Sequence, residues 1–304
     1  MKDVIIIGGG PAGFSAAIYA VRAGLNVLIL EKAMWGGQAV NTPEIENYPG
    51  ILKVSGAEFS IQLYNQVSSL GVEVDNREVT KVELEGPVKK IYTGEELLTA
   101  KSVIIANGVS RRTLGCDGEK EYEGRGVSYC ATCDGAFFRE KDVALVGGGN
   151  TAMEDALFLS NLCRKVYVIH RRNNFRADKI SIEELQKRTN VEFILDSVVE
   201  EIYGETLVKG ILVYNRVNQE KRKIDVQGIF VAIGYKPDNR MFEQQLELDQ
   251  DGYFITDENC HTRIPGVYVA GDCRSKKLRQ IVTAAADGAV AGFEAANYCN
   301  TMKE

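Results

Sequence analysis

The chain has little positive charge, few histidines and only one closely spaced pair of cysteines. Its 36 lysines and arginines are outnumbered by 42 acidic residues, which gives a formal net charge of −6, so binding to nucleic acid has no electrostatic support. It has two histidines and seven cysteines, and an odd number of cysteines at irregular spacing is a poor framework for structural disulfides. We therefore expect a reducing, cytoplasmic compartment in which most of the cysteines are ordinary thiols.

The N-terminal region contains an uncharged stretch that resembles a signal peptide or a membrane span. Residues 4–21 carry no charge, and Lys2 precedes them. Three glycines and a proline at 8–11 interrupt the stretch, which suits neither interpretation. A similar pattern begins at Val143, in mid-chain, where no signal peptide can lie. We therefore interpret residues 4–21 as a buried strand, a glycine turn and a helix, and expect no association with membranes.

One sequence plan occurs twice in the chain, with an offset of 139 residues (143 minus 4). Residues 4–10 match 143–149, and residues 27–32 match 166–171. Each copy predicts a strand, a glycine-rich turn, a helix and a second strand. Short apolar runs of this kind are typical of parallel strands that are buried on both faces. Two such units predict an α/β protein with two Rossmann-like, three-layer dinucleotide-binding domains.

The second domain is predicted to be inserted into the first. A last apolar strand at 267–270 runs into Gly271 and Asp272, far beyond the second glycine turn, so the first domain closes with C-terminal sequence. We place the first, discontinuous domain at 1–111 and 241–304, and the inserted domain, which carries the cysteine pair, at 112–240.

The first glycine turn has the pattern of a dinucleotide site. Gly8, Gly10 and Gly13 permit, in that order, a tight turn, approach of the backbone to a pyrophosphate, and close packing of helix on strand. The helix N-terminus offers N–H donors and partial positive charge to the phosphates. Glu31 follows Gly10 by 21 residues (31 minus 10), where a carboxylate can accept both hydroxyls of an adenosine ribose. The alternative, a purely structural turn, leaves this carboxylate unexplained.

The second glycine turn differs from the first at the ribose position. The motif at 147–152 reads G-x-G-x-x-A, an accepted variant. His170 occupies the position equivalent to Glu31, and Arg171 and Arg172 follow it. A 2′-phosphate on the ribose would be repelled by a carboxylate and bound by guanidinium groups. The sequence therefore predicts NADP(H) rather than NAD(H), with a solvated basic turn as the alternative.

The closely spaced cysteines are Cys130 and Cys133. Two intervening residues allow the sulfurs to bridge when the pair lies in a turn that enters a helix, and the helix N-terminus favours the thiolate. Asp134 is a candidate acid/base for the sulfurs, with a helix cap as the alternative. A structural zinc site usually needs two such pairs, and the only other Cys/His neighbours are Cys260 and His261. We therefore expect a redox-active pair and no metal.

Seven segments together resemble the bacterial-type, low-molecular-weight thioredoxin reductases. They are GGGPAG (8–13), EKAMWGGQ (31–38), ENYPG (46–50), CATCDG (130–135), GGGNTAMEDA (147–156), HRRNNFRA (170–177) and VAGDCRSKKLRQIVTAA (269–285). The same family includes the flavoprotein of an alkyl hydroperoxide reductase system, which carries an extra N-terminal module that we do not expect in this chain. One departure is Asn107, where the family often has threonine.

The resemblance implies two cofactors, FAD in the first domain and NADPH in the second. The residues implied for FAD are Gly8, Gly10, Pro11, Ala12, Gly13, Glu31, Lys32, Gly36, Gly37, Gln38, Asn47, Gly108, Gly271, Asp272, Arg279, Gln280 and Ile281. The residues implied for NADPH are Gly147, Gly149, Asn150, Thr151, His170, Arg171, Arg172 and Arg176.

The resemblance also implies the reaction and the partner. Hydride passes from NADPH to FAD and then to the Cys130–Cys133 disulfide, with Cys133 facing the flavin. Cys130 then attacks a disulfide of thioredoxin or a similar small protein through a mixed disulfide. The family forms homodimers, and its inserted domain rotates between two positions. The alternatives are a reductase fed by ferredoxin, since some relatives lose the second glycine turn and its arginines, and a flavin-bound redox sensor without turnover.

Overall fold

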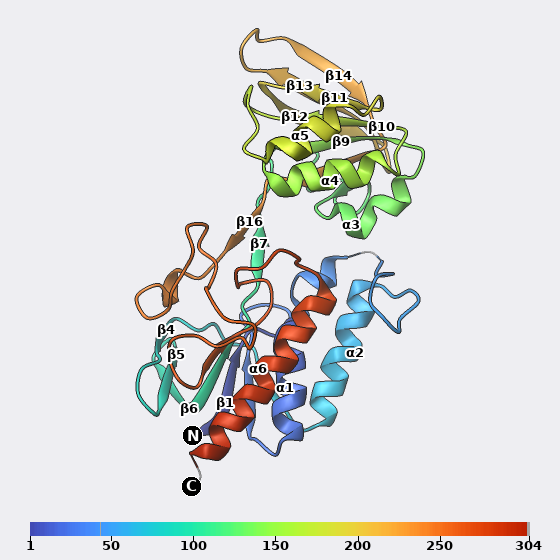
Figure 1. Cartoon of the computed structure of the whole chain (residues 1–304). Helices are drawn as coiled ribbons and strands as arrows, with labels where there is room; N and C mark the ends of the chain where they lie inside the picture. Colours follow the sequence, from blue (N-terminus) through green and yellow to red (C-terminus); the bar gives the residue numbers. More distant parts are fainter. Residues whose placement is uncertain (43, 303–304) are drawn as a thin grey trace. The chain divides into compact units, whose positions relative to one another are not determined.

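The computed structural model describes residues 1–42 and 44–302, which divide into two compact units (Figure 1). The first unit is Met1–Ser110 together with the segment that starts at Lys236, and the second is Arg111–Tyr235. The chain passes between the units at β7 (Val109–Arg111) and β16 (Tyr235–Pro237), and these two strands pair with each other. The second unit is thus an insertion in the first.

Residues 236–240, which the sequence placed with the inserted domain, belong to the first unit. Asn239 explains the difference. Its side chain is only 1% exposed and donates to the carbonyl oxygens of Gly252 and Cys273 at 2.9 and 3.1 Å. A buried amide with both donors satisfied fixes this segment in the first unit, and no local pattern announces such a contact.

The first unit is built on a seven-stranded sheet. Along the sheet the order is β3-β2-β1-β6-β5-β4, and β17 also pairs with β6. Strands β1, β2, β3, β6 and β17 run parallel, while β4, β5 and the first half of β6 form an antiparallel ribbon. The bounds are β1 (Lys2–Ile7), β2 (Val27–Leu30), β3 (Glu73–Asp75), β4 (Lys81–Glu83), β5 (Lys89–Thr93), β6 (Glu96–Ile105) and β17 (Val267–Val269).

Three helices cover one face of this sheet (Figure 1). They are α1 (Pro11–Arg22), α2 (Gly56–Ser69) and α6 (Ile281–Thr301), and the short 3₁₀ turns are η1 (Gly37–Asn41) and η3 (Arg240–Phe242). Alternate residues of β1 enter two separate cores, Ile6 on the helix side and Ile5 on the other. Helix α6 packs closely on α1, because a Cβ on Gly288 would lie 2.1 Å from the carbonyl oxygen of Ala12.

The second unit repeats the plan on a smaller scale. Its parallel sheet has the order β11-β10-β9-β15-β8, with α4 on one face and a three-stranded antiparallel sheet, β12-β13-β14, on the other. The strands are β8 (Val127–Ser128), β9 (Asp142–Gly147), β10 (Lys165–Ile169), β11 (Val191–Ile194), β12 (Ser197–Gly204), β13 (Val208–Asn215), β14 (Lys221–Asp225) and β15 (Gly228–Ala232). The helices are α3 (Ala131–Asp134), α4 (Asn150–Ser160), α5 (Lys179–Gln186) and the 3₁₀ turn η2 (Gly135–Phe138).

Both units therefore have the predicted strand, glycine turn, helix and strand, and the α/β class with two Rossmann-like folds is confirmed. Within the described part of the chain, no helix combines the length and the apolar character needed to span a bilayer.

Candidate functional site

The first glycine turn joins β1 to α1 in a form that only glycine permits at two positions. Gly8 has φ of 115°, and a Cβ there would lie 2.2 Å from the carbonyl oxygen of Ala106. A Cβ on Gly13 would lie 1.9 Å from the carbonyl oxygen of Gly8. The turn is therefore pressed against the end of β6, and the N-terminus of α1 is left open to an anion.

Glu31 lies beside this turn, directly after β2. Its carboxylate accepts the Gly9 N–H at 2.7 Å and the Ala33 N–H at 2.9 Å. A carboxylate has about four acceptor sites, so two remain for the hydroxyls of a ribose. The loop that begins at Gly36 is bound to the same turn, because the Gly36 N–H donates to the carbonyl oxygen of Gly9 at 2.7 Å. Lys32 forms an exposed ion pair with Asp238.

Two unsatisfied acceptors lie just beyond the ends of β6 and β17. Asn107 Oδ1 and Asp272 Oδ1 are buried and have no hydrogen-bond partner in the described structure. Burial raises the pKa of the Asp272 carboxyl to about 6, although the positive charges of Lys276 and Arg279 act to lower it. Because orphaned buried acceptors are rare and costly, these atoms fit a bound molecule with hydroxyl or N–H donors. The sugar and flavin parts of FAD carry such donors, so the residues present fit this cofactor.

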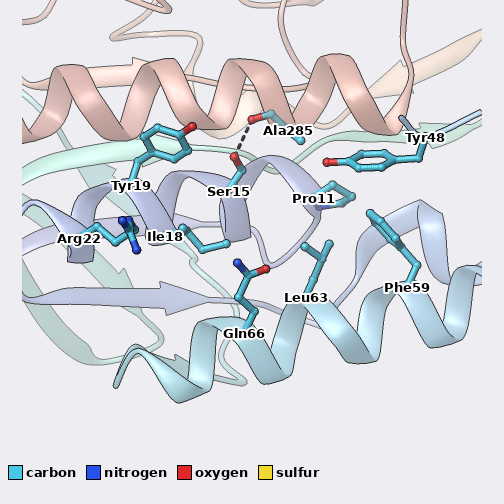
Figure 2. A pocket seen from close by; sticks show the side chains of 10 residues that line it. All are labelled: Pro11, Ser15, Ile18, Tyr19, Arg22, Tyr48, Phe59, Leu63, Gln66 and Ala285. Carbon is cyan, nitrogen blue, oxygen red and sulfur yellow. Dashed lines mark hydrogen bonds between the residues drawn. The ribbon is translucent and has the colours of Figure 1, made fainter. Parts of the chain in front are cut away.

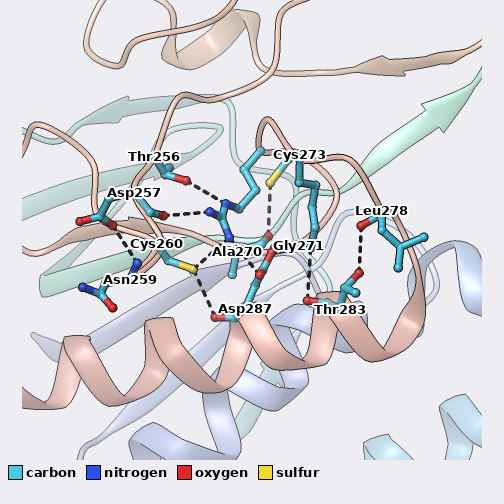
Figure 3. Close-up of polar contacts among 12 residues, drawn as sticks. Thr256, Asp257, Asn259, Cys260, Ala270, Gly271, Cys273, Leu278, Thr283 and Asp287 are labelled. Atoms are coloured by element: carbon cyan, nitrogen blue, oxygen red, sulfur yellow. Dashed lines mark hydrogen bonds and ion pairs between the residues drawn. The ribbon is translucent and has the colours of Figure 1, made fainter. Parts of the chain in front are cut away.

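Asp272 is held in place by a buried ion cluster around Asp287 (Figure 3). Asp287 of α6 accepts the Gly271 N–H at 3.0 Å, Arg274 Nη1 at 2.9 Å and Lys276 Nζ at 2.8 Å. The side chains of all three charged residues are only 12–13% exposed. The sequence interpretation missed this cluster. The sequence does contain an indication of this cluster, because Asp287 is the one charged residue in the otherwise uncharged stretch 281–293.

Removing the charge of Asp287 is expected to weaken FAD binding about tenfold or more. Asp287→Asn leaves Arg274 and Lys276 without their counter-charge, and charge-assisted hydrogen bonds contribute about 1.5–3 kcal/mol each. The measurement is the FAD dissociation constant of stripped protein, by flavin fluorescence. Glu294→Gln, on the same helix but remote from the Gly271 turn, is the control, and equal affinities in the two variants would show that the cluster does not support the site.

The remaining residues implied for FAD lie around the start of α6. Arg279 stacks on Tyr253 with its guanidinium 4.0 Å from the ring centre, and its Nε donates to the Asp272 carbonyl oxygen at 3.2 Å. Gln280 is the N-cap of α6, directly before Ile281, and its Oε1 accepts Asn47 Nδ2 at 3.0 Å. The structure thus brings Asn47, Asp272, Arg279 and Gln280 together in the first unit.

The second glycine turn joins β9 to α4, which begins at Asn150 and Thr151. His170 is 9% exposed, stacks on Phe175 with ring centres 5.2 Å apart, and fills the space beside the turn. A Cβ on Gly148 would lie 2.2 Å from the His170 ring. Burial lowers the pKa of His170, and neighbouring arginines lower it further. His170 therefore forms a neutral wall of the turn.

Arg171, Arg172 and Arg176 are exposed in the loop that follows β10. The loop is fixed to the turn, because the Arg176 N–H donates to the Gly148 carbonyl oxygen at 2.8 Å and Asn150 pairs with Asp178. Among the described residues, none of the three guanidinium groups has a carboxylate partner within ion-pair distance. Three unpaired cations beside a glycine turn fit a phosphorylated ribose.

Cys130 and Cys133 form a disulfide with their Cα atoms 5.3 Å apart. Cys130 is the N-cap of α3, and its Sγ accepts the Cys133 N–H at 3.2 Å. Burial raises the pKa of the Asp134 carboxyl, against the opposing effects of Ser128 and Arg111. Asp134 makes no capping hydrogen bond to η2, so the structure disfavours the helix-cap alternative. The other five cysteines, Cys116, Cys163, Cys260, Cys273 and Cys299, are thiols, as predicted.

A groove of about 550 Å³ lies between α1, α2 and the start of α6, and Pro11 is the one residue implied for FAD that lines it (Figure 2). Tyr19, Tyr48 and Phe59 line it, and Arg22 is its one charged residue. It contains no thiol and no carboxylate, so we assign it no part in the chemistry.

The comparisons with known proteins agree with these two nucleotide turns and the disulfide. Residues 2–288 match the model of the pyridine nucleotide-disulphide oxidoreductase family, and the chain belongs to this family. It is therefore an FAD- and NADPH-dependent disulfide oxidoreductase.

Within that family the chain falls among the bacterial-type thioredoxin reductases. The thioredoxin reductase of Mycolicibacterium smegmatis is 42% identical over 98% of this chain and 96% of that protein. The crystal structure of thioredoxin reductase from Streptococcus pyogenes MGAS5005 is 43% identical, covers 99% of both chains and has a TM-score of 0.95. The Lactococcus lactis enzyme in its FR conformation is 41% identical over 99% of this chain and 100% of that chain, with a TM-score of 0.68.

Proposed function

We propose that this flavoprotein reduces the disulfide of thioredoxin, or of a similar small protein, with NADPH as the electron donor. The observation that carries the proposal is the Cys130–Cys133 disulfide at the start of α3, next to the buried carboxyl of Asp134. The same chain contains both nucleotide turns, and the relatives compared above are thioredoxin reductases.

The chain's own residues supply binding and orientation. FAD and NADPH, when bound, supply the electron pair that opens the Cys130–Cys133 disulfide. Glu31 and the orphaned oxygens of Asn107 and Asp272 would accept hydrogen bonds from FAD. The loop arginines, which are Arg171, Arg172 and Arg176, would bind the 2′-phosphate of NADPH.

The opened cysteine pair then exchanges with the partner. Asp134 accepts the proton of the Cys130 thiol, and the thiolate attacks one sulfur of the partner disulfide. That disulfide breaks, its other sulfur leaves and takes up a proton, and a mixed disulfide forms. The Cys133 thiolate next attacks the Cys130 sulfur, which re-forms the disulfide and releases the second partner sulfur as a thiolate that is protonated. Two electrons have then passed from the pair to the partner.

The two alternative functions, a ferredoxin-fed reductase and a redox sensor, would not need residues that this chain contains. A reductase fed by ferredoxin has no need of a 2′-phosphate site, whereas this chain keeps the second glycine turn and three unpaired arginines. A redox sensor has no need of an acid/base beside its disulfide, whereas this chain has the buried carboxyl group of Asp134 directly after Cys133. Both observations favour an NADPH-dependent enzyme.

We further propose a cytoplasmic homodimer. The family resemblance implies this assembly. Large apolar side chains are exposed on each helix of the first unit's helix layer, with Tyr19 on α1, Ile61 on α2 and Phe293 on α6 at least 49% exposed. Exposed large apolar side chains that lie together on one surface are typical of a site of association, so these three positions are candidates for the dimer interface. Light scattering of the purified protein measures the assembly directly.

Steady-state oxidation of NADPH tests the proposed function. Purified enzyme with thioredoxin from the same organism is expected to consume NADPH and to form thioredoxin thiols in a 1:2 ratio. Omission of thioredoxin is expected to stop the consumption. Thioredoxin reduction by ferredoxin but not by NADPH would instead support the ferredoxin alternative, and no turnover with either donor would support the sensor.

A further inference from the structure

Ser128 connects the two groups that carry the exchange chemistry. Its hydroxyl donates to Asp134 Oδ2 at 2.6 Å, and Ser128 Oγ also accepts the Cys130 N–H at 3.1 Å. The residue is 5% exposed at the end of β8, two residues before the disulfide. Neither its spacing nor its residue type marks it in the sequence, and the mechanism above does not use it.

The Ser128 hydroxyl has a second acceptor within reach, the Cys130 carbonyl oxygen at 3.3 Å. One hydroxyl has a single proton, so it donates to one acceptor at a time. When Asp134 is a carboxylate, the Ser128 proton points to Oδ2. When Asp134 is protonated, its own O–H can donate to Ser128 Oγ, and the Ser128 proton turns to the Cys130 carbonyl. The 2.6 Å contact is therefore retained in both ionisation states.

We propose that Ser128 is a positioning residue for Asp134, which holds this carboxyl group against the cysteine pair whether or not it carries a proton. The proposal rests on the proposed acid/base role of Asp134. Ser128 Oγ links the Asp134 carboxyl group to the Cys130 backbone, and without this contact the carboxyl group would be free to rotate at the moment when it must accept or return a proton. A proton transfer depends on hydrogen-bond distance, so rotation lowers its rate.

The groups around Asp134 determine the direction in which loss of the Ser128 hydroxyl shifts the pKa of this carboxyl group. Burial raises the pKa of Asp134, while the Ser128 hydrogen bond and the charge of Arg111 on β7 lower it. Arg111 itself pairs with Glu123 at 2.6 Å and lies over the Tyr129 ring at 4.4 Å, so it stays in place when Ser128 is changed. Loss of the Ser128 hydroxyl removes a donor that favours the charged form. The pKa of Asp134 therefore rises further.

The test is the rate at which NADPH-reduced enzyme is reoxidised by thioredoxin disulfide, measured across pH in a stopped-flow instrument. Ser128→Ala is expected to react about tenfold more slowly than wild type, a part of the 10²–10⁴-fold that a positioned acid/base contributes. The limb of the pH profile that reports Asp134 is expected to move to higher pH. Ser160→Ala is the matched control, because Ser160 is also buried in this unit and donates only to a backbone carbonyl, that of Leu157.

Asp134→Asn and the double variant separate positioning from a structural role. If Ser128 acts through Asp134, adding Ser128→Ala to Asp134→Asn causes no further loss, and Ser128→Thr, which retains the hydroxyl, keeps the wild-type profile. Effects that multiply in the double variant, or a Ser128→Ala enzyme with the wild-type rate and profile, would overturn the proposal. A wild-type rate in Asp134→Asn would instead overturn the acid/base role on which the proposal rests. Should Ser128→Ala fail to fold, a shifted profile in a flavin-containing Ser128→Thr enzyme would likewise contradict it.

Discussion

Replacing either Cys130 or Cys133 by serine is expected to abolish turnover with thioredoxin, a loss of at least about a thousandfold, because exchange needs a thiolate and a second sulfur to resolve the mixed disulfide. NADPH is still expected to reduce the flavin in both variants, since neither nucleotide turn includes a cysteine. Absorbance at the flavin and NADPH maxima follows both steps. Cys163→Ser is the control, because Cys163 is a buried free thiol of the same unit and is expected to leave turnover unchanged.

The two cysteine variants are also expected to differ from each other. With Cys133 facing the flavin, Cys130→Ser leaves an inner thiolate that produces a long-wavelength charge-transfer band. Cys133→Ser leaves an outer thiol that captures thioredoxin as a stable mixed disulfide, which gel electrophoresis without reductant detects. The reverse pattern would exchange the two roles, and full turnover in either variant would remove the disulfide from the mechanism.

Replacing Arg171 and Arg172 together by glutamine is expected to weaken the use of NADPH and to leave that of NADH nearly unchanged. A well-formed contact between a guanidinium group and a phosphate contributes about 1.5–3 kcal/mol, or roughly 10- to 150-fold, for each arginine. NADH lacks the 2′-phosphate and gains nothing from these contacts. The measurement is kcat/KM for each coenzyme with saturating thioredoxin.

A half-buried arginine elsewhere in the same unit, Arg188, controls for the loss of general positive charge. Arg188→Gln removes a charge that pairs with Glu184 on α5 and is expected to change neither coenzyme's kcat/KM. Equal losses for NADPH and NADH in the Arg171 and Arg172 variant would show that the loop is only a solvated basic turn.

The parts of the fold that the sequence predicted are those with local, backbone-based causes. Gly8 and Gly13 are glycines because neighbouring carbonyl oxygens leave no room for a Cβ, so the requirement is visible in the motif itself. The spacing of Cys130 and Cys133 likewise follows from one turn of chain. Such constraints need no knowledge of distant segments, and both turns and the disulfide are where the pattern placed them.

The parts that the sequence did not predict depend on contacts between distant segments. Asn239 fixes the domain border through Cys273, 34 residues away, and Asp287 holds Gly271 across the turn into α6. Ser128 is close to its partner in sequence, but a lone serine in a two-residue strand has no distinctive pattern. The position of His170 in the sequence predicts a nucleotide contact. In the structure its ring lies against Gly148, so His170 also shapes the turn. Side-chain packing decides each of these cases.

In the proposed mechanism, electrons from NADPH reach the Cys130–Cys133 pair and leave from it to thioredoxin. The most direct measurement is anaerobic titration of the enzyme with NADPH, followed by alkylation and peptide mass spectrometry. We expect Cys130 and Cys133 to become alkylated as NADPH is added, while the alkylation of Cys116, Cys163, Cys260, Cys273 and Cys299 stays constant. Oxidised thioredoxin added before the alkylating reagent is expected to protect the pair again. A pair that stays unalkylated after excess NADPH, or that thioredoxin does not reoxidise, would show that electrons do not take this route.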